Sequence, residues 1–221
     1  MITSTFTVVA TDGEDWGVAV ASRVLAVGAI VPAADAGWGV VATQAAVNVG
    51  WKRAGMSLLQ GGCSAQQAVD QLVAEDARPD VRQLIVLDRA GRAAAYSGER
   101  CQQWAGHIVG EGFAVAGNLL AGAAVIESMA SAYRSSAGPL IQRLLLSLES
   151  GDSAGGDRRG RQSAAVQVVR LAGGIDGLDD RVCDLRVDDH PDPVRELRRL
   201  ASIQFGDAGE TPSSAPRPAA D

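Results

Sequence analysis

The sequence predicts an α+β protein built as a four-layer αββα sandwich, in which two β-sheets pack face to face and helices cover their outer faces. Successive strand-like runs are joined by short turns rather than by helical crossovers, which favours antiparallel hairpins. Several of these runs are apolar on both faces, as expected for sheets that are covered on both sides. Amphipathic segments separate the groups of strands and can supply the outer layers.

The expected strands are short, rich in Val and Ala, and bounded by Gly or Asp at turn positions. In chain order they cover residues 5–11, 16–22, 29–35, 39–44, 82–88, 92–98, 107–118, 161–170 and 181–189. Residues 107–118 hold one strand or two. The turn at residues 88–91 begins with Asp and ends with Gly, which is typical of a type I turn between paired strands.

Four segments predict helices. Residues 64–76 have the pattern of a capping box, because Ser64 can accept a bond from the first turn and Gln67 can return one. Apolar residues align on one face of residues 119–135 and again on one face of residues 139–149. The last helix begins near Asp192, which can cap it, with Pro193 in its first turn.

The chain length and composition indicate one globular domain. With 221 residues, one core over residues 1–204 is expected, and the Pro- and Ser-rich residues 205–221 are expected to form a disordered tail. The net charge of −6 argues against a nucleic-acid surface. No apolar run approaches a membrane span, so a cytoplasmic protein is expected. Three separated cysteines, without a CxxC pair, indicate buried free thiols rather than disulfides or a zinc site.

Three arginines crowd residues 155–162, GGDRRGRQ, which we call the arginine loop. In a chain that is acidic overall, this positive segment can bind a small anion or pair with the protein's own carboxylates. It lacks the spacing and the lysine of a P-loop.

Long strings along the chain resemble a known family. They include VGAIVPAADAGWGVVATQ, GGDRRGRQSAA and DLRVDDHPDP, the last two being the most specific. From Thr5 to about Leu200 the chain resembles the family called domain of unknown function 1028 (DUF1028). The resemblance implies an N-terminal nucleophile (Ntn) hydrolase-like fold, the αββα sandwich of proteasome β subunits and penicillin acylases.

In Ntn hydrolases a Thr, Ser or Cys at the start of the first strand attacks an amide carbonyl, and its free α-amine is the general base. The resemblance implies that Thr5, in TFTVVA, is this nucleophile. A free amine there requires a cut between Ser4 and Thr5, because trimming of Met1 is not expected before the large Ile2. The alternative is a strand threonine selected for its β-branch.

Two further residues have candidate catalytic roles. Asn118, at a strand end, can contribute an amide donor to an oxyanion hole. Arg23 falls near the position where related hydrolases carry a charged residue, and a nearby cation would lower the pKa of the nucleophile's amine. A turn asparagine and a surface ion pair are the respective alternatives.

The arginine loop is the candidate substrate-binding segment. Arg158, Arg159 and Arg161 can bind a carboxylate in a bidentate manner, with Asp157 and Ser163 orienting them. The alternative is an internal network with carboxylates of the C-terminal region, namely Asp184, Asp188, Asp189 and Asp192.

The resulting hypothesis is an Ntn-type amidohydrolase that cleaves the C–N bond of a small, carboxylate-bearing amide, without a cofactor. The other hypothesis is a non-catalytic protein of the same fold that binds a small anion or is structural, in either case as a homo-oligomer. No metal is expected, because the histidine in DDHPDP (188–193) lacks diagnostic ligand spacing. Neither a nucleic-acid nor a membrane partner is expected.

Overall fold

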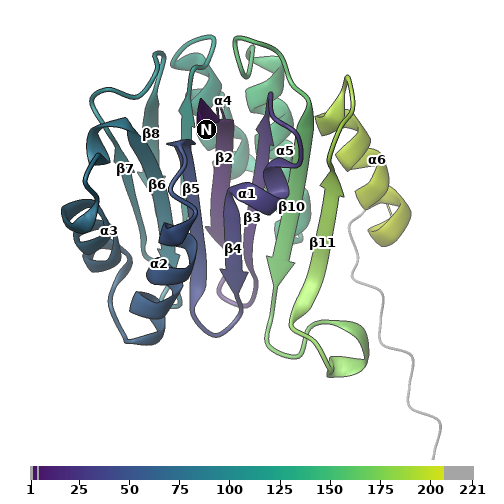
Figure 1. The fold of residues 1–221 in the computed structure, drawn as a ribbon. Helices are drawn as coiled ribbons and strands as arrows, with labels where there is room; N and C mark the ends of the chain where they lie inside the picture. Colours follow the sequence, from purple (N-terminus) through teal and green to yellow (C-terminus); the bar gives the residue numbers. More distant parts are fainter. Residues whose placement is uncertain (1, 4, 207–221) are drawn as a thin grey trace, which may run out of the picture.

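The computed structural model describes residues 2–3 and 5–206, and it confirms a mixed α+β fold with two antiparallel sheets (Figure 1). The strands are β1 Ile2–Thr3, β2 Thr5–Thr11, β3 Trp16–Ser22, β4 Pro32–Asp35, β5 Gly39–Ala46, β6 Arg82–Asp88, β7 Ala93–Ser97, β8 Gly106–Gly110, β9 Phe113–Asn118, β10 Ser163–Val169 and β11 Arg181–Val187. The helices are α1 Val27–Ile30, α2 Gly50–Gln60, α3 Ala65–Glu75, α4 Ala124–Ser135, α5 Leu140–Ser153 and α6 Pro193–Phe205, with 3-10 turns η1 Pro79–Val81 and η2 Ile175–Gly177. The expected disordered tail lies outside the described residues, apart from Phe205, the last residue of α6, and Gly206, its C-cap.

The six-stranded sheet has the order β11-β10-β3-β2-β9-β8, so its first hairpin, β2–β3, is central. The five-stranded sheet has the order β1-β5-β6-β7, and β4 also pairs with β5. All pairs are antiparallel, as the short turns between strands predict.

The two sheets face each other across an apolar core. Alternate residues of β2 and β3, such as Val9 and Val18, meet residues of the other sheet, such as Val40 and Ile85, and all are fully buried or nearly so. Because side chains alternate along a strand, the intervening residues of β2 and β3 point to the opposite face of the sheet.

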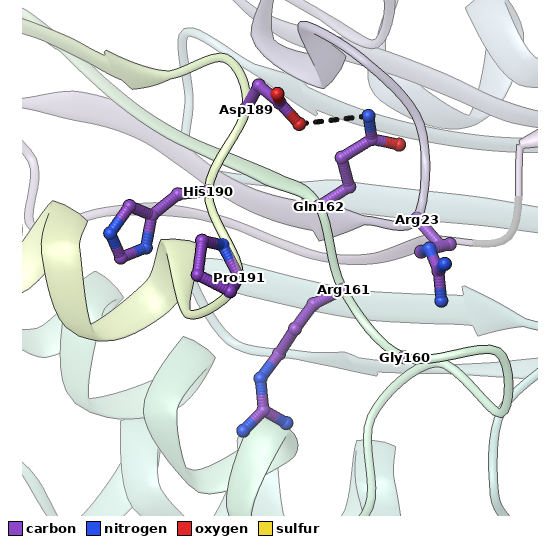
Figure 2. A pocket seen from close by; sticks show the side chains of 7 residues that line it. All are labelled: Arg23, Gly160, Arg161, Gln162, Asp189, His190 and Pro191. Atoms are coloured by element: carbon purple, nitrogen blue, oxygen red, sulfur yellow. Dashed lines mark hydrogen bonds between the residues drawn. The ribbon is translucent and has the colours of Figure 1, made fainter.

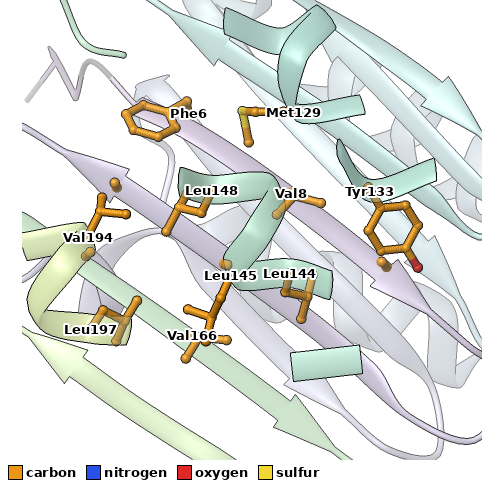
Figure 3. Packing of buried hydrophobic residues seen from close by; sticks show 14 of the residues in the cluster. Phe6, Val8, Met129, Tyr133, Leu144, Leu145, Leu148, Val166, Val194 and Leu197 are labelled. Atoms are coloured by element: carbon orange, nitrogen blue, oxygen red, sulfur yellow. The ribbon is translucent and has the colours of Figure 1, made fainter. Parts of the chain in front are cut away.

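Helices cover the outer face of each sheet. On the six-stranded sheet, α4, α5 and α6 bury a large cluster that includes Phe6, Met129, Leu144, Leu148 and Leu197 (Figure 3). Each fully buried Leu of this kind contributes roughly 2 kcal/mol. On the five-stranded sheet, α2 and α3 pack over β5 and β6. This apolar packing on both faces of each sheet explains the unusually apolar strands.

Several elements differ from the sequence-based expectation. Helix α2 was not expected; it carries no side-chain cap, and only its residues Trp51, Gly55 and Leu59 are buried. Residues 29–35 are not one strand, because α1 ends at Ile30 before β4 begins. Helix α4 begins at Ala124 rather than near residue 119.

The cap at the start of α6 also differs. Asp192 holds the N-cap position, yet its side chain makes no capping bond. Its carboxylate instead lies 3.8 Å from the Nε of Arg161. The proline expected in the first turn, Pro193, is there.

Candidate functional site

Four polar residues form a continuous row at one end of the six-stranded sheet. Asn118, Thr5, Ser22 and Ser163 lie on the adjacent strands β9, β2, β3 and β10, and each is directly opposite the next in the strand register. All four are fully buried, at 0% exposure. We call them the polar row. Thr5 and Asn118, singled out separately in the sequence, are therefore cross-strand neighbours.

The polar row faces the interior between the two sheets. Thr5 lies four residues before Val9, and Ser22 lies four residues after Val18; both valines belong to the inter-sheet core. Even spacing along a strand keeps side chains on the same face, and directly opposed residues share that face. The hydroxyl of Thr5 donates to that of Ser22 across 3.4 Å.

A second set of buried polar groups from the other sheet meets this row. The side-chain amide of Asn118 donates to the Oε1 of Gln83 across 3.3 Å, and Gln44 donates to the same oxygen across 2.7 Å. Gln44 in turn accepts a 2.6 Å bond from the hydroxyl of Thr7. Hydroxyl and amide groups thus cross-link the two sheets beneath Thr5.

The chain before Thr5 belongs to the other sheet. Ile2 and Thr3 form β1 and pair with Ala46 and Ala45 of β5, whereas Thr5 opens β2 in the six-stranded sheet. The backbone therefore crosses from one sheet to the other just before Thr5. In this uncut chain the nitrogen of Thr5 is part of a peptide bond and its side chain is inaccessible to solvent.

Asp157 organises the arginine loop. Its carboxylate accepts bonds from the backbone N–H of Arg23 (3.0 Å) and of Arg159 (2.8 Å). The guanidinium of Arg159 adds bonds of 3.1 and 3.3 Å to the same carboxylate. The side chain of Asp157 is 0% exposed. Asp157 and Arg159 thus bind each other.

The other arginines of the loop differ in their partners. Arg161 lies 2.9 Å from Asp152 and 3.8 Å from Asp192, so it pairs with one of the four C-terminal carboxylates considered from sequence. Arg158 is exposed and donates to the carbonyl of Gln103 across 3.3 Å. Burial raises the pKa of the Asp152 carboxyl, and the guanidinium of Arg161 opposes this shift.

Three of those four carboxylates have other partners. Asp184 pairs with Arg181, Asp188 pairs with Arg186, and Asp189 accepts a bond from Gln162. An internal network of all three loop arginines with these carboxylates is therefore not present among the described residues.

A cavity of about 630 Å³ opens beside the arginine loop (Figure 2). It is lined by Arg23, Gly160, Arg161, Gln162, Asp189, His190 and Pro191. Arg23 donates to the backbone carbonyl of Arg159 and has no ion pair with any carboxylate that the structure describes. The Nδ1 of His190 accepts a 3.0 Å bond from the N–H of Asp192, so its Nε2 carries the proton when the ring is neutral.

The cavity brings together part of the predicted site. Arg23 and Arg161 line it, whereas Arg158, Arg159 and Asp157 do not. Ser163 lies outside it as well: its hydroxyl donates to the carbonyl of Val24 across 2.5 Å and accepts from the N–H of Val27 across 3.0 Å. These bonds join β10 to the segment that leads into α1.

Sequence reasoning missed the buried polar residues Ser22, Gln44 and Gln83, and it considered His190 as a metal ligand. The two glutamines had a usable signal, because each is a polar amide within a largely apolar strand. Ser22 had none, since only the strand register brings it to Thr5.

The described residues hold no group of three or more His, Cys, Asp or Glu side chains arranged to bind a metal ion. In the same part of the chain, no helix has the length and apolarity needed to cross a membrane.

By its fold, the chain is an α+β protein with two facing antiparallel sheets, and a buried row of hydroxyl and amide groups lies at one end of their interface. More specifically, the chain belongs to the family described as "Family of unknown function (DUF1028)", whose model matches residues 5–197. The family resemblance expected from the sequence strings is thereby confirmed.

One solved structure agrees with this assignment. The crystal structure of protein SPO2555 from Silicibacter pomeroyi, described with the same family model, is 29% identical, has a TM-score of 0.83 and covers 93% of this chain and 91% of its own. Anbu (ancestral beta-subunit) from Yersinia bercovieri is 15% identical with a TM-score of 0.41, covering 90% and 96%, a similarity too low to carry an argument. No curated protein is significantly similar to the chain.

Proposed function

We propose that this protein is an Ntn-type amidohydrolase in which Thr5, once freed of the residues before it, attacks the amide carbonyl of a small, carboxylate-bearing substrate. The observation that carries the proposal is the alignment of Asn118, Thr5 and Ser22 in one buried row. The helix–sheet–sheet–helix packing supports the αββα sandwich that the family resemblance implies.

Each residue has a defined role in the proposed reaction. The α-amine of Thr5 accepts the hydroxyl proton as the oxygen attacks and returns it to the leaving amine, which leaves an ester on Thr5. The same amine then takes a proton from the water that hydrolyses this ester, and the acid is released as the Thr5 hydroxyl is restored. The amide of Asn118 donates to the oxyanion that develops on the substrate carbonyl. Arg23 directly follows Ser22 in the chain, and its positive charge favours the neutral, basic form of the Thr5 α-amine.

The cavity beside the arginine loop is the proposed anchor for the substrate carboxylate. Neighbouring strands lie roughly 5 Å apart, and Arg23 directly follows the residue that pairs with Thr5. A small substrate therefore suffices to span the distance from a carboxylate at Arg23 and Arg161 to an amide at Thr5.

The decisive experiment compares two forms of the chain, one beginning at Thr5 after removal of a cleavable leader and one retaining the preceding residues. Amine release from a panel of small carboxylate-bearing amides, with the intact mass of each form, is the measurement. The form that begins at Thr5 is expected to be active. In it, Thr5→Ala lowers kcat by at least about a thousandfold, and Thr5→Ser retains activity.

Equal activity in a form whose mass shows residues 1–4 intact would exclude the Thr5 amine as the base. A complete lack of hydrolysis in the form that begins at Thr5, combined with binding of small acids, would favour the second candidate function.

That second candidate is a non-catalytic, homo-oligomeric protein that binds a small anion. The observation that favours it is that Ile2 and Thr3, which precede Thr5, pair with β5 in the other sheet, and that Thr5 itself is fully buried. Arg23→Ala is expected to weaken binding of a small dicarboxylate at least about tenfold, since a charge-assisted bidentate contact is lost. Arg158→Ala is the matched control, because it removes an exposed arginine that lies outside the cavity.

A further inference from the structure

Gln83 occupies a central place between the two sheets. It is fully buried, and it pairs in register with Gln44 on one side and Ser97 on the other. A buried primary amide is costly unless its donors and acceptor are bonded, so its contacts fix its orientation.

Two backbone carbonyls determine which way the Gln83 amide points. Its Nε2 lies 2.9 Å from the oxygen of Gly117 and 3.1 Å from the oxygen of Gly106. Carbonyl oxygens only accept hydrogen bonds, so the nitrogen must face them. The same nitrogen is 2.7 Å from the hydroxyl oxygen of Ser97.

The Oε1 of Gln83 must then face the opposite way, toward two other amides. It accepts from the Nε2 of Gln44 at 2.7 Å and from the Nδ2 of Asn118 at 3.3 Å. A carbonyl oxygen has two lone pairs, so both are used. The backbone of β8 and β9 thus dictates, through Gln83, which end of the Asn118 side chain is nitrogen.

We infer that Gln83 is the positioning residue for Asn118: it holds the Nδ2 of Asn118 inward at the level of Thr5 and fixes the direction of that nitrogen's second N–H bond. This inference rests on the proposed function, in which Asn118 is the oxyanion donor. A donor must be preorganised toward the developing charge, and a displacement of about 1 Å can cost a hundredfold in rate.

Gln44 provides a matched control. Like Gln83 it is a fully buried glutamine between the sheets and a member of the same hydrogen-bonded set. It has no bond to Asn118 among the contacts that the structure describes. Gln83→Met and Gln44→Met remove an amide at nearly constant side-chain volume, yet only the first removes the acceptor of Asn118.

The test measures the Asn118 side-chain amide directly, by its NMR signal and its hydrogen exchange, in chains that begin at Thr5. Asn118→Asp assigns the signal, because it deletes that NH₂ group. In Gln83→Met we expect the Asn118 amide to shift and to exchange at least about tenfold faster, and kcat to fall about ten- to a hundredfold with KM nearly unchanged. In Gln44→Met we expect a much smaller change in each.

Equal effects of the two methionine variants on the Asn118 signal would overturn the inference and leave Gln83 as a structural cross-link. If only Gln83→Met changes the Asn118 signal and the chains hydrolyse no amide, Gln83 still positions Asn118, but the protein is not an amidohydrolase. If Gln83→Met does not fold, Gln83→Glu keeps an oxygen acceptor toward Asn118. Slow exchange of the Asn118 amide is then expected, and fast exchange would contradict the inference.

Discussion

The polar row and the arginine loop lie at the same end of the six-stranded sheet, yet the two regions handle polarity in opposite ways. The row is neutral, and its members are 0% exposed. The loop is charged and largely exposed, and two of its arginines neutralise nearby carboxylates, Arg159 with Asp157 and Arg161 with Asp152. A cluster of charged residues is therefore a poor guide to a catalytic site here, because most of the loop's charges form ion pairs within the protein.

The largest expected effect on stability follows from removing the Asp157 carboxylate, on which the arginine loop depends. Asp157→Ala leaves two backbone N–H groups and the guanidinium of Arg159 without their buried acceptor. We expect the free energy of unfolding to fall by about 3 kcal/mol, measured by urea denaturation. Arg158→Ala, the control, should change it by less than about 0.5 kcal/mol. A loss below about 1 kcal/mol for Asp157→Ala would show that the loop does not depend on this carboxylate.

The next prediction concerns the neutral network, by which we mean the hydrogen-bonded side chains of Thr7, Gln44, Gln83 and Asn118. Thr7→Val keeps the shape of the side chain but removes the 2.6 Å bond to Gln44, so a buried acceptor loses its donor. A loss of about 1–2 kcal/mol is expected in the same denaturation experiment. Thr43→Val is the matched control, since the buried hydroxyl of Thr43 has no hydrogen-bond partner among the described residues. That control should be neutral or stabilising, and an equal loss in both variants would contradict the importance of the network.

A smaller effect concerns Arg161, which is 38% exposed beside Asp152. Burial raises the pKa of Asp152, so the folded protein retains this proton to higher pH than the unfolded chain, and stability is lost as the pH rises through the folded pKa. Arg161 opposes that shift. We expect Arg161→Ala to cost about 1 kcal/mol at pH 7 and less as the pH falls and Asp152 becomes protonated. A cost that is independent of pH would mean that the pair contributes nothing through charge.

The same variant also distinguishes recognition from structure. If the cavity holds a carboxylate, Arg161→Ala weakens ligand binding by a larger free energy than it removes from folding. The reverse pattern, read from isothermal titration beside the denaturation curve, would assign Arg161 to internal pairing.

The smallest expected effect concerns His107, which contacts the neutral network through Ser97. The hydroxyl oxygen of Ser97 accepts from Gln83 and lies 2.9 Å from the Nδ1 of His107, to which it donates when the ring is neutral with its proton on Nε2. Burial lowers the pKa of His107, so the unfolded chain binds the proton more readily, and this contribution to stability is lost as the pH falls below about 6.5. Between pH 7.5 and 5.5, Tm should fall by less than about 2 °C on this account. His107→Asn should abolish that part of the change; an unaltered pH profile would show that His107 does not contribute.

The sequence predicted the strands well where apolar alternation and turn residues agreed, as in residues 5–11, 16–22 and 82–88. It failed for α2, whose glycines mask a spacing of four between its buried residues. The apolar residues 29–35 favour a single strand in the sequence, yet the segment divides between the end of α1 at Ile30 and β4, which begins at Pro32.

The candidate site was only partly predictable for a physical reason. Thr5 and Asn118 are more than one hundred residues apart in sequence, and only the register between β2 and β9 makes them neighbours. The arginines were visible as a cluster, and Asp157 and Asp192 were among the expected partners. Asp152 was not, because only the packing of α5 against the loop brings it to Arg161. A local pattern reports residue types, whereas pairing depends on the whole fold.

The strand β1, which precedes Thr5, is short enough to detach from its sheet without global unfolding. Among the residues that the structure describes, two pairs, Ile2 with Ala46 and Thr3 with Ala45, join this strand to β5. Segments with so few contacts open locally at a small fraction of the free energy of global unfolding. Amide hydrogens of β1 should therefore exchange early, while those of the central strand β6 exchange only when the molecule unfolds. Local opening of β1 would therefore free the chain that leads into Thr5 while β2 stays paired with β3 and β9.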